Sequence, residues 1–259
     1  PNLLKLVEGQ VGKTGGDDWR VVGGHRVWYA PEDPIRSYFP DNEMVNFEII
    51  SDKEIMFSVS LTPEVEKTLI MRVANNDQTF EIKNKISNIG SNILRTASWG
   101  ITAFIPGGIG FLPFKKGNTF EESLCANTKL SLWDYTNLSD PAFRWHSDCL
   151  EIDQSYVRSK QKIGTFLTKP WTAYKILDYL IIKSLKSDNH HADGCSYPDQ
   201  GSNIEVYLDA NLLELESLSP LADLLPGESV SHVECLNVLK VGSNCDHKKV
   251  IELASNSIT

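Results

Sequence analysis

Three glutamates in the C-terminal part of the chain have types and spacing that could support chemistry. Glu214 and Glu216 stand two positions apart in L-E-L-E, and Glu205 precedes them in I-E-V-Y. Residues i and i+2 of a strand point to the same face, so Glu214 and Glu216 share a face, which Glu205 joins if the register allows. Carboxylates on one face repel one another. They therefore line either a solvated sheet face or a site that uses them.

The elements that carry these glutamates follow from the apolar pattern. Apolar and polar residues alternate from 204 to 208 and again from 213 to 216, which predicts two half-buried strands. The intervening Asp-Ala-Asn at 209–211 has turn chemistry, so the two strands are expected to form a hairpin.

A second cluster of polar and aromatic residues lies between Gly23 and Asn42. It includes His25, Arg26 and Trp28, and prolines at 31, 34 and 40 interrupt it. This proline spacing forbids a regular helix and predicts an irregular loop of a kind that often carries sites. Charged planar groups and aromatic faces suit sugar hydroxyls and sugar rings. The alternative, which the residues leave open, is that the arginines only form ion pairs with neighbouring acids.

Composition limits the function classes. The chain has 259 residues, a net charge of -9 and a pI near 5.2, so nucleic acid is not an expected partner. A neutral or cationic partner is expected instead, and a small-molecule carbohydrate fits this requirement. The five cysteines are widely spaced and lack a C-x-x-C pair, which predicts reduced, mostly buried thiols and a cytoplasmic location, with two disulfides and one free thiol as the alternative. The sequence contains neither a signal peptide nor an apolar run long enough for a membrane span, so no membrane partner is expected.

Two further motifs are only weak evidence for a binding site. The glycine-rich stretch 9–16 lacks the first glycine of a phosphate-binding loop, because Val7 stands there, and no strand-loop-helix context surrounds it. The segment 187–195, S-D-N-H-H-A-D-G-C, holds possible metal ligands without a spacing that would place them on one face. We expect no cofactor and no bound metal.

The rest of the chain is predicted to form the strands and the helix that support the site. Alternating segments from 45 to 88 predict a β-meander with a turn at 75–77, and 93–105 predicts a further strand that contains Trp99. The stretch 173–185 is ambiguous between helix and buried strand, and 243–254 predicts a terminal helix capped by Ser243 or Asn244. Many short strands and one good helix predict an all-β fold, a large antiparallel β-sandwich.

Three motifs support a family resemblance. They are G-G-H-R-V-W-Y-A-P-E-D at 23–33, Y-P-D-Q-G-S-N-I-E-V-Y at 197–207 and L-L-P-G-E-S-V-S-H at 224–232. With them the chain resembles an uncharacterised domain family related to galactose mutarotase (aldose 1-epimerase-like proteins). The resemblance implies a galactose mutarotase-like supersandwich over 1–259, a single domain that lacks its first strands, with 173–185 as strand and a sugar cleft on the concave sheet face.

The resemblance also implies roles for residues. Mutarotation needs a base for the anomeric hydroxyl and an acid for the ring oxygen. Glu216 matches the basic glutamate of the epimerases, and His25 is the candidate acid. Arg26 would orient the sugar and Trp28 or Trp99 would stack on it. The full expected substrate-binding set is Arg26, Trp28, Glu32, Trp99, Lys162, Glu205 and Glu214.

One departure from the family bears on catalysis. The segment 97–104, where the epimerases carry a histidine of the sugar site, reads A-S-W-G-I-T-A-F here and has none. The expected function is a carbohydrate-binding protein that interconverts sugar anomers by Glu/His acid-base catalysis. The missing histidine favours the alternative, a non-catalytic sugar-binding protein, and a structural β-sandwich domain is the third candidate. Convergence of the expected site residues in one pocket would favour a sugar site, and their scatter would favour the structural alternative. The sequence leaves the oligomeric state open.

Overall fold

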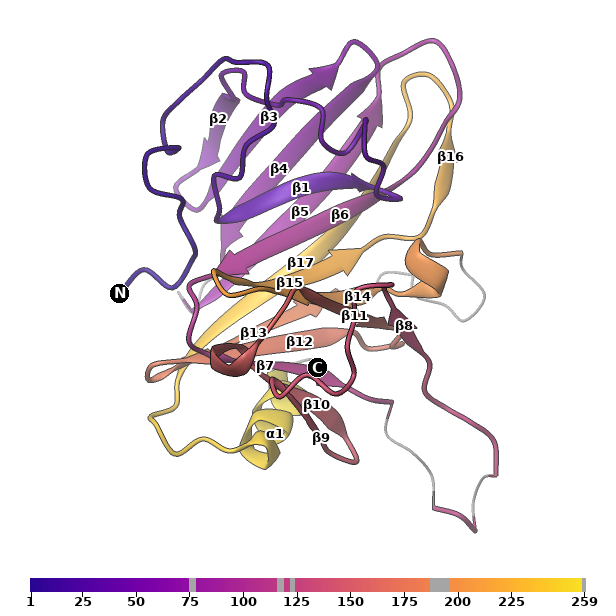
Figure 1. The fold of residues 1–259 in the computed structure, drawn as a ribbon. Coiled ribbons are helices and arrows are strands. Elements are labelled where there is room, and N and C mark those ends of the chain that lie inside the picture. Colours follow the sequence, from indigo (N-terminus) through magenta and orange to yellow (C-terminus); the bar gives the residue numbers. More distant parts are fainter. Residues whose placement is uncertain (75–77, 116–118, 122–123, 187–195, 258–259) are drawn as a thin grey trace.

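Two antiparallel β-sheets face each other in a sandwich (Figure 1). The computed structural model describes residues 1–74, 78–115, 119–121, 124–186 and 196–257. One sheet has seven strands, with the order β1-β6-β15-β14-β11-β8 and β16 paired to the start of β6. Its strands are β1 (His25–Ala30), β6 (Leu94–Phe104), β8 (Leu130–Leu132), β11 (Gln161–Thr165), β14 (Ile204–Leu208), β15 (Leu213–Leu218) and β16 (Ala222–Leu224).

The second sheet has ten strands in the order β2-β3-β4-β5-β17-β13-β12-β7-β10-β9. They are β2 (Asn46–Ser51), β3 (Glu54–Thr62), β4 (Val65–Val73), β5 (Thr79–Asn88), β7 (Ile109–Pro113), β9 (Phe143–Trp145), β10 (Cys149–Asp153), β12 (Trp171–Ile176), β13 (Tyr179–Leu185) and β17 (Ser229–Lys240). Two 3-10 turns, Gln154–Tyr156 and Asp199–Gly201, and the helix α1 (His247–Ser257) complete the described elements. This architecture confirms the predicted large antiparallel β-sandwich.

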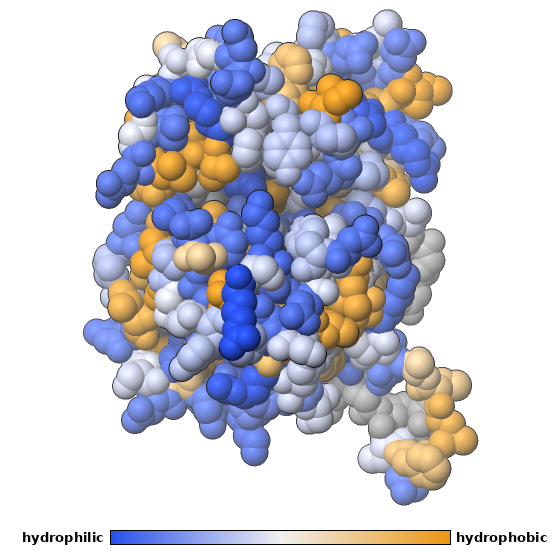
Figure 2. All heavy atoms as spheres, in the orientation of Figure 1, coloured by the Kyte–Doolittle hydropathy of each residue, from blue (hydrophilic) through white to orange (hydrophobic). Residues whose placement is uncertain are grey.

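The apolar core lies between the sheets because each strand turns its alternating hydrophobic face inward. Val206 and Leu215 of the smaller sheet belong to the same buried cluster as Leu112 and Ile152 of the larger one. Burying one such side chain stabilises the fold by about 1.5–3 kcal/mol. Outside, hydrophobic surface forms separate groups between hydrophilic residues (Figure 2). Within the described residues, no helix is long and apolar enough to cross a membrane.

Several predicted elements differ in detail from the observed ones. The cluster 23–42, predicted as an irregular loop, begins with strand β1, which pairs with β6 and stops at the first proline. The ambiguous stretch 173–185 is strand, but it is split into the β12–β13 hairpin. Helix α1 starts four residues later than predicted, and Asp246 caps it by accepting a hydrogen bond from the Lys249 N–H. The predicted turn at 75–77 lies outside the described residues.

A buried polar network links the two sheets across β15. Lys183 of β13 donates hydrogen bonds to the backbone carbonyls of Gly100 (2.9 Å) and Leu215 (2.8 Å), and its ammonium lies 3.2 Å from the Glu234 carboxylate. Burial opposes ionisation of Glu234, but Lys183 and His25 outweigh burial and hold its pKa well below the ordinary value. Gly100 must remain glycine, since a Cβ there would lie 1.9 Å from the Glu234 carboxylate. The two sheets are therefore joined by hydrogen bonds from a buried lysine of the larger sheet to backbone carbonyls of the smaller one, as well as by apolar packing.

The Lys183→Met variant should lose stability, because it leaves the Glu234 carboxylate buried without its cation. We expect a loss of about 3–5 kcal/mol in the free energy of unfolding, measured by urea denaturation. Lys249→Met is the matched control, since the Lys249–Glu252 pair on α1 is half exposed and should change stability by less than ~1 kcal/mol. Equal effects of the two substitutions would contradict a structural role for the buried pair.

Candidate functional site

The hairpin of β14 and β15 places the three glutamates on the outer face of the seven-stranded sheet. In the observed register Glu205 lies directly opposite Glu216, and Glu214 lies opposite Tyr207. Alternation sends the apolar residues of both strands into the sandwich and the glutamates to the other face. The predicted shared face is therefore present. It is not solvated, because Glu205, Glu214 and Glu216 are 0%, 6% and 1% exposed.

Lys162 of β11 compensates the charge of two of these carboxylates. Its Nζ lies 2.9 Å from Oε2 of Glu205 and 3.0 Å from Oε2 of Glu216. Burial disfavours the ammonium, but the two carboxylates outweigh burial and raise the pKa of Lys162 well above its ordinary value. For Glu205, burial is the largest effect and raises its pKa well above the ordinary value, against the opposing effect of Lys162.

Arg26 of β1 is paired with the third carboxylate. Its Nη1 lies 3.0 Å from Oε1 of Glu214. Arg26 therefore forms an ion pair, as the alternative from the sequence proposed, but its partner comes from another strand. Burial raises the pKa of Glu214, and Arg26 only partly opposes this increase. The two carboxyl groups of β15 thus have different surroundings: Glu216 faces an ammonium and Glu214 a guanidinium.

Aromatic rings surround the charged groups. The Trp99 indole N–H donates to Oε2 of Glu216 at 2.9 Å, and the Lys162 ammonium lies 4.4 Å from the Trp99 ring centroid. Trp133 approaches Lys162 from another side, at 4.7 Å. Trp28 makes edge contacts with Trp99 and with Tyr38, with centroids 5.4 Å and 5.3 Å apart. These rings exclude water from the ion pairs and so strengthen their electrostatic interaction.

The charged and aromatic groups border one cavity of about 600 Å³, a volume in the range of ligand-binding pockets. The residues that line it are Trp19, Val21, Arg26, Trp28, Glu32, Tyr38, Trp99, Ile101, Trp133, Tyr135, Lys160, Lys162, Tyr207, Asp209, Leu212, Glu214 and Glu216. Within the described part of the chain, the pocket has no trio of His, Cys, Asp or Glu ligand atoms close enough together to hold a metal.

Most of the expected site residues meet in this cavity. The lining contains one catalytic candidate, Glu216, and the substrate-binding candidates Arg26, Trp28, Glu32, Trp99, Lys162 and Glu214. Glu205 contacts Lys162 but is fully buried and does not line the cavity. Convergence on this scale argues against an acidic strand that is merely solvated.

His25 lies on the opposite face of the sheet from the pocket. Its Nδ1 is 2.8 Å from the Thr102 hydroxyl and its Nε2 is 2.9 Å from the Asn84 side-chain oxygen, inside the sandwich. The expectation that His25 faces the sugar site is therefore corrected, for a simple reason: neighbouring residues of a strand point to opposite faces, and Arg26 points to the pocket. Burial lowers the pKa of His25 to about 4, so its ring is neutral near pH 7.

Sequence reasoning missed several aromatic residues of the lining. Trp19, Tyr38, Trp133, Tyr135 and Tyr207 all border the cavity, and Tyr38 donates a 2.6 Å hydrogen bond to Glu32. Trp19 precedes β1, and Trp133 and Tyr135 follow β8. Residues in such connecting segments have no period that predicts a shared face. For these residues the only available signal was the local density of aromatic residues, whereas Tyr207 of β14 shares the face of Glu205 because it stands two positions from it.

Comparisons with known proteins bear on the fold. No family model and no curated protein matches the sequence. Similar solved structures include a galactose mutarotase-like protein from Lactobacillus casei, with 11% identity and a TM-score of 0.53, over 92% of this chain and 84% of that one. A putative mutarotase from Salmonella typhimurium has 12% identity and a TM-score of 0.54, over 92% and 80%. A Synechocystis protein, Slr1438, has 12% identity and a TM-score of 0.56, over 92% and 84%.

At these identities the likeness shows the fold. The chain has the galactose mutarotase-like β-sandwich fold, as the resemblance implied. On the outer face of its seven-stranded sheet it carries a pocket in which two glutamates, a lysine and an arginine meet aromatic rings.

The buried His25 should make stability depend on pH. Its folded pKa of about 4 lies below the ordinary value of about 6.5, so the unfolded chain binds more protons between these values. The neutral ring therefore contributes to the free energy of unfolding in full above about pH 6.5. This contribution is lost as the pH decreases, and the loss reaches about 3 kcal/mol at pH 4. Urea unfolding of the wild type and of His25→Gln from pH 7 to pH 4.5 checks this. The same pH dependence in both proteins would show that His25 is not its source.

Proposed function

We propose that this chain is a carbohydrate-binding protein and that a small sugar occupies the pocket on the outer face of the seven-stranded sheet. One observation carries the proposal: Glu214, Glu216, Lys162 and Arg26 converge in a single cavity with walls of tryptophan and tyrosine. Carboxylates accept hydrogen bonds from hydroxyl groups, and guanidinium and ammonium groups donate to hydroxyl oxygens. Aromatic rings offer an apolar surface to the C–H face of a sugar ring.

The geometry of Glu216 leaves it partly available to a ligand. Among the described residues, the two donors to Glu216, the Trp99 N–H and the Lys162 ammonium, both contact its Oε2. These two donors fix the carboxylate and leave Oε1 to accept from a sugar hydroxyl. Charge-assisted hydrogen bonds of this kind are roughly twice as strong as neutral ones.

A second candidate function, interconversion of sugar anomers, is supported by the neighbouring carboxyl group of Glu214. Mutarotation needs a base and an acid that reach one hemiacetal. Glu216, with its ammonium partner, is suited to the carboxylate role. Burial raises the pKa of Glu214, which favours its protonated form and suits it to the acid role. We therefore assign the base to Glu216 and the acid to Glu214 in place of His25.

Isothermal titration with a panel of monosaccharides tests binding, with Glu216→Gln as the variant. Loss of the charged acceptor should weaken the binding of a sugar that binds the wild type by about tenfold or more, the equivalent of the ~1.5–3 kcal/mol of a hydrogen bond to a charged group. Glu252→Gln, an exposed site on α1, is the matched control and should leave affinity unchanged.

The same variants separate binding from catalysis. NMR exchange spectroscopy between the α and β anomers should show acceleration by the wild type that is lost in Glu216→Gln and in Glu214→Gln. If a sugar binds but its anomers do not exchange faster, the protein binds that sugar without catalysing its mutarotation. If no sugar in the panel binds or exchanges faster, the carbohydrate proposal fails for that panel and the pocket serves another ligand.

A further inference from the structure

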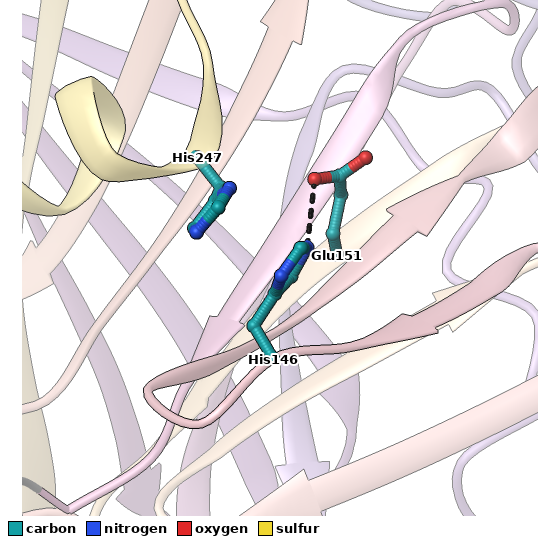
Figure 3. Close-up of side chains that lie close together, drawn as sticks. All are labelled: His146, Glu151 and His247. Atoms are coloured by element: carbon teal, nitrogen blue, oxygen red, sulfur yellow. Dashed lines mark hydrogen bonds and ion pairs between the residues drawn. The ribbon is translucent and has the colours of Figure 1, made fainter.

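Three potential metal ligands meet at the far end of the ten-stranded sheet (Figure 3). His146 comes from the turn between β9 and β10, Glu151 from β10 and His247 from the first residue of α1. One ligand atom from each lies within 4.8 Å of the others. None of the three lines the proposed sugar pocket, so this cluster stands independently of the proposed function.

One pair of ligand atoms in the cluster already lies at the spacing of a coordination sphere. His146 Nε2 is 3.1 Å from Oε2 of Glu151, and the two imidazole rings are stacked with centroids 3.8 Å apart. Two ligand atoms on one tetrahedral zinc ion are roughly 3.4 Å apart, given bond lengths near 2.1 Å. The His146 and Glu151 atoms therefore already have the spacing of two ligands, and the stacked imidazoles must rotate so that one nitrogen of each faces the ion.

The surroundings orient Glu151 toward the imidazoles. Its side chain is buried in the sheet, and its other oxygen, Oε1, accepts from Arg144, the residue opposite it on β9. Oε2 is left to face the imidazoles. A hydrogen-bonded partner on the free oxygen of a ligating carboxylate is a usual outer-shell feature of metal sites.

The position of His247 is not explained by hydrogen bonding. Its ring stacks on His146, yet its nitrogens make no hydrogen bond to any other residue that the structure describes. The rival explanation, a plain His146–Glu151 hydrogen bond, accounts for two of the residues and leaves His247 without a role. An ion bound by all three accounts for the whole cluster.

Packed elements carry Glu151 and His247, and the backbone N–H of His146 in the turn donates to the Cys149 carbonyl at 2.9 Å. Strand β10 is paired on both sides, with β7 and with β9. Helix α1 packs Val250 and Ala254 into a buried cluster with Cys149, which lies between His146 and Glu151 in the sequence. Ligands on packed elements lose little freedom when an ion binds, so the site is preorganised.

We propose that His146, Glu151 and His247 bind a divalent transition-metal ion, and that this ion is Zn²⁺. Two imidazoles and one carboxylate are a typical zinc set, and three protein ligands leave a fourth position for water. Mg²⁺ and Ca²⁺ prefer oxygen ligands throughout. The bound ion joins the β9–β10 turn to α1.

The test is calorimetric titration of the whole chain with zinc chloride. The segment 187–195 has two adjacent histidines and a cysteine, so the titrations use a background protein with His190→Ala, His191→Ala and Cys195→Ser. We expect one zinc ion per chain and no binding of magnesium. His247→Ala and, separately, His146→Ala should each weaken zinc binding by at least about tenfold. Lys248→Ala, at the next and exposed position of α1, should leave it unchanged.

Two further measurements distinguish loss of zinc binding from loss of folding. Circular dichroism shows whether each variant is folded, and thermal unfolding should show that zinc raises the Tm of the background protein but not of His247→Ala. Absence of zinc binding to the background protein overturns the proposal. Zinc binding of unchanged affinity in both histidine variants overturns it too, because the ion would then lie elsewhere.

Discussion

A buried lysine holds strand β15 from each of its two faces, and the rest of the structure depends on this constraint. Inside the sandwich, Lys183 binds the Leu215 carbonyl and the Glu234 carboxylate. On the outer face, Lys162 binds Glu216, the next residue of the strand. Burial disfavours a lone charge by several kcal/mol, so each lysine needs its carboxylate and each carboxylate its lysine. A shift of β15 by one residue would exchange its two faces and separate Glu216 from Lys162, so the register is strongly specified.

The same constraint connects packing to the pocket. Gly100 of β6 accepts from Lys183 inside the sandwich, and its neighbour Trp99 donates to Glu216 on the other face. The indole, the ammonium and the carboxylate therefore occupy positions that the core network helps to set. A binding group held by packing and hydrogen bonds before the ligand arrives loses less entropy when the ligand binds.

The fold is shared with galactose mutarotase-like proteins, while the pocket here has its own chemistry. Position 99 and its neighbours on β6 offer an indole rather than an imidazole, and the only histidine of the G-G-H-R motif points into the core. The described lining of the pocket holds no histidine, and its titratable side chains are carboxyl, phenol and ammonium or guanidinium groups. A fold tolerates such replacement because the site is carried by outward-facing side chains that contribute little to the core.

The sequence by itself determined the sandwich, the hairpin of β14 and β15 and the shared face of Glu214 and Glu216, because period-two alternation is a local property of a strand. It also marked Arg26, Trp28, Trp99 and Lys162 as residues that could serve one site. Only the tertiary structure decided that β1 pairs with β6 in the register that turns His25 inward. Only the structure brought Trp133 to Lys162 and His247 to Glu151, since these contacts join distant segments whose spacing has no period. Local patterns set which face a side chain takes, and long-range packing sets which side chains meet there.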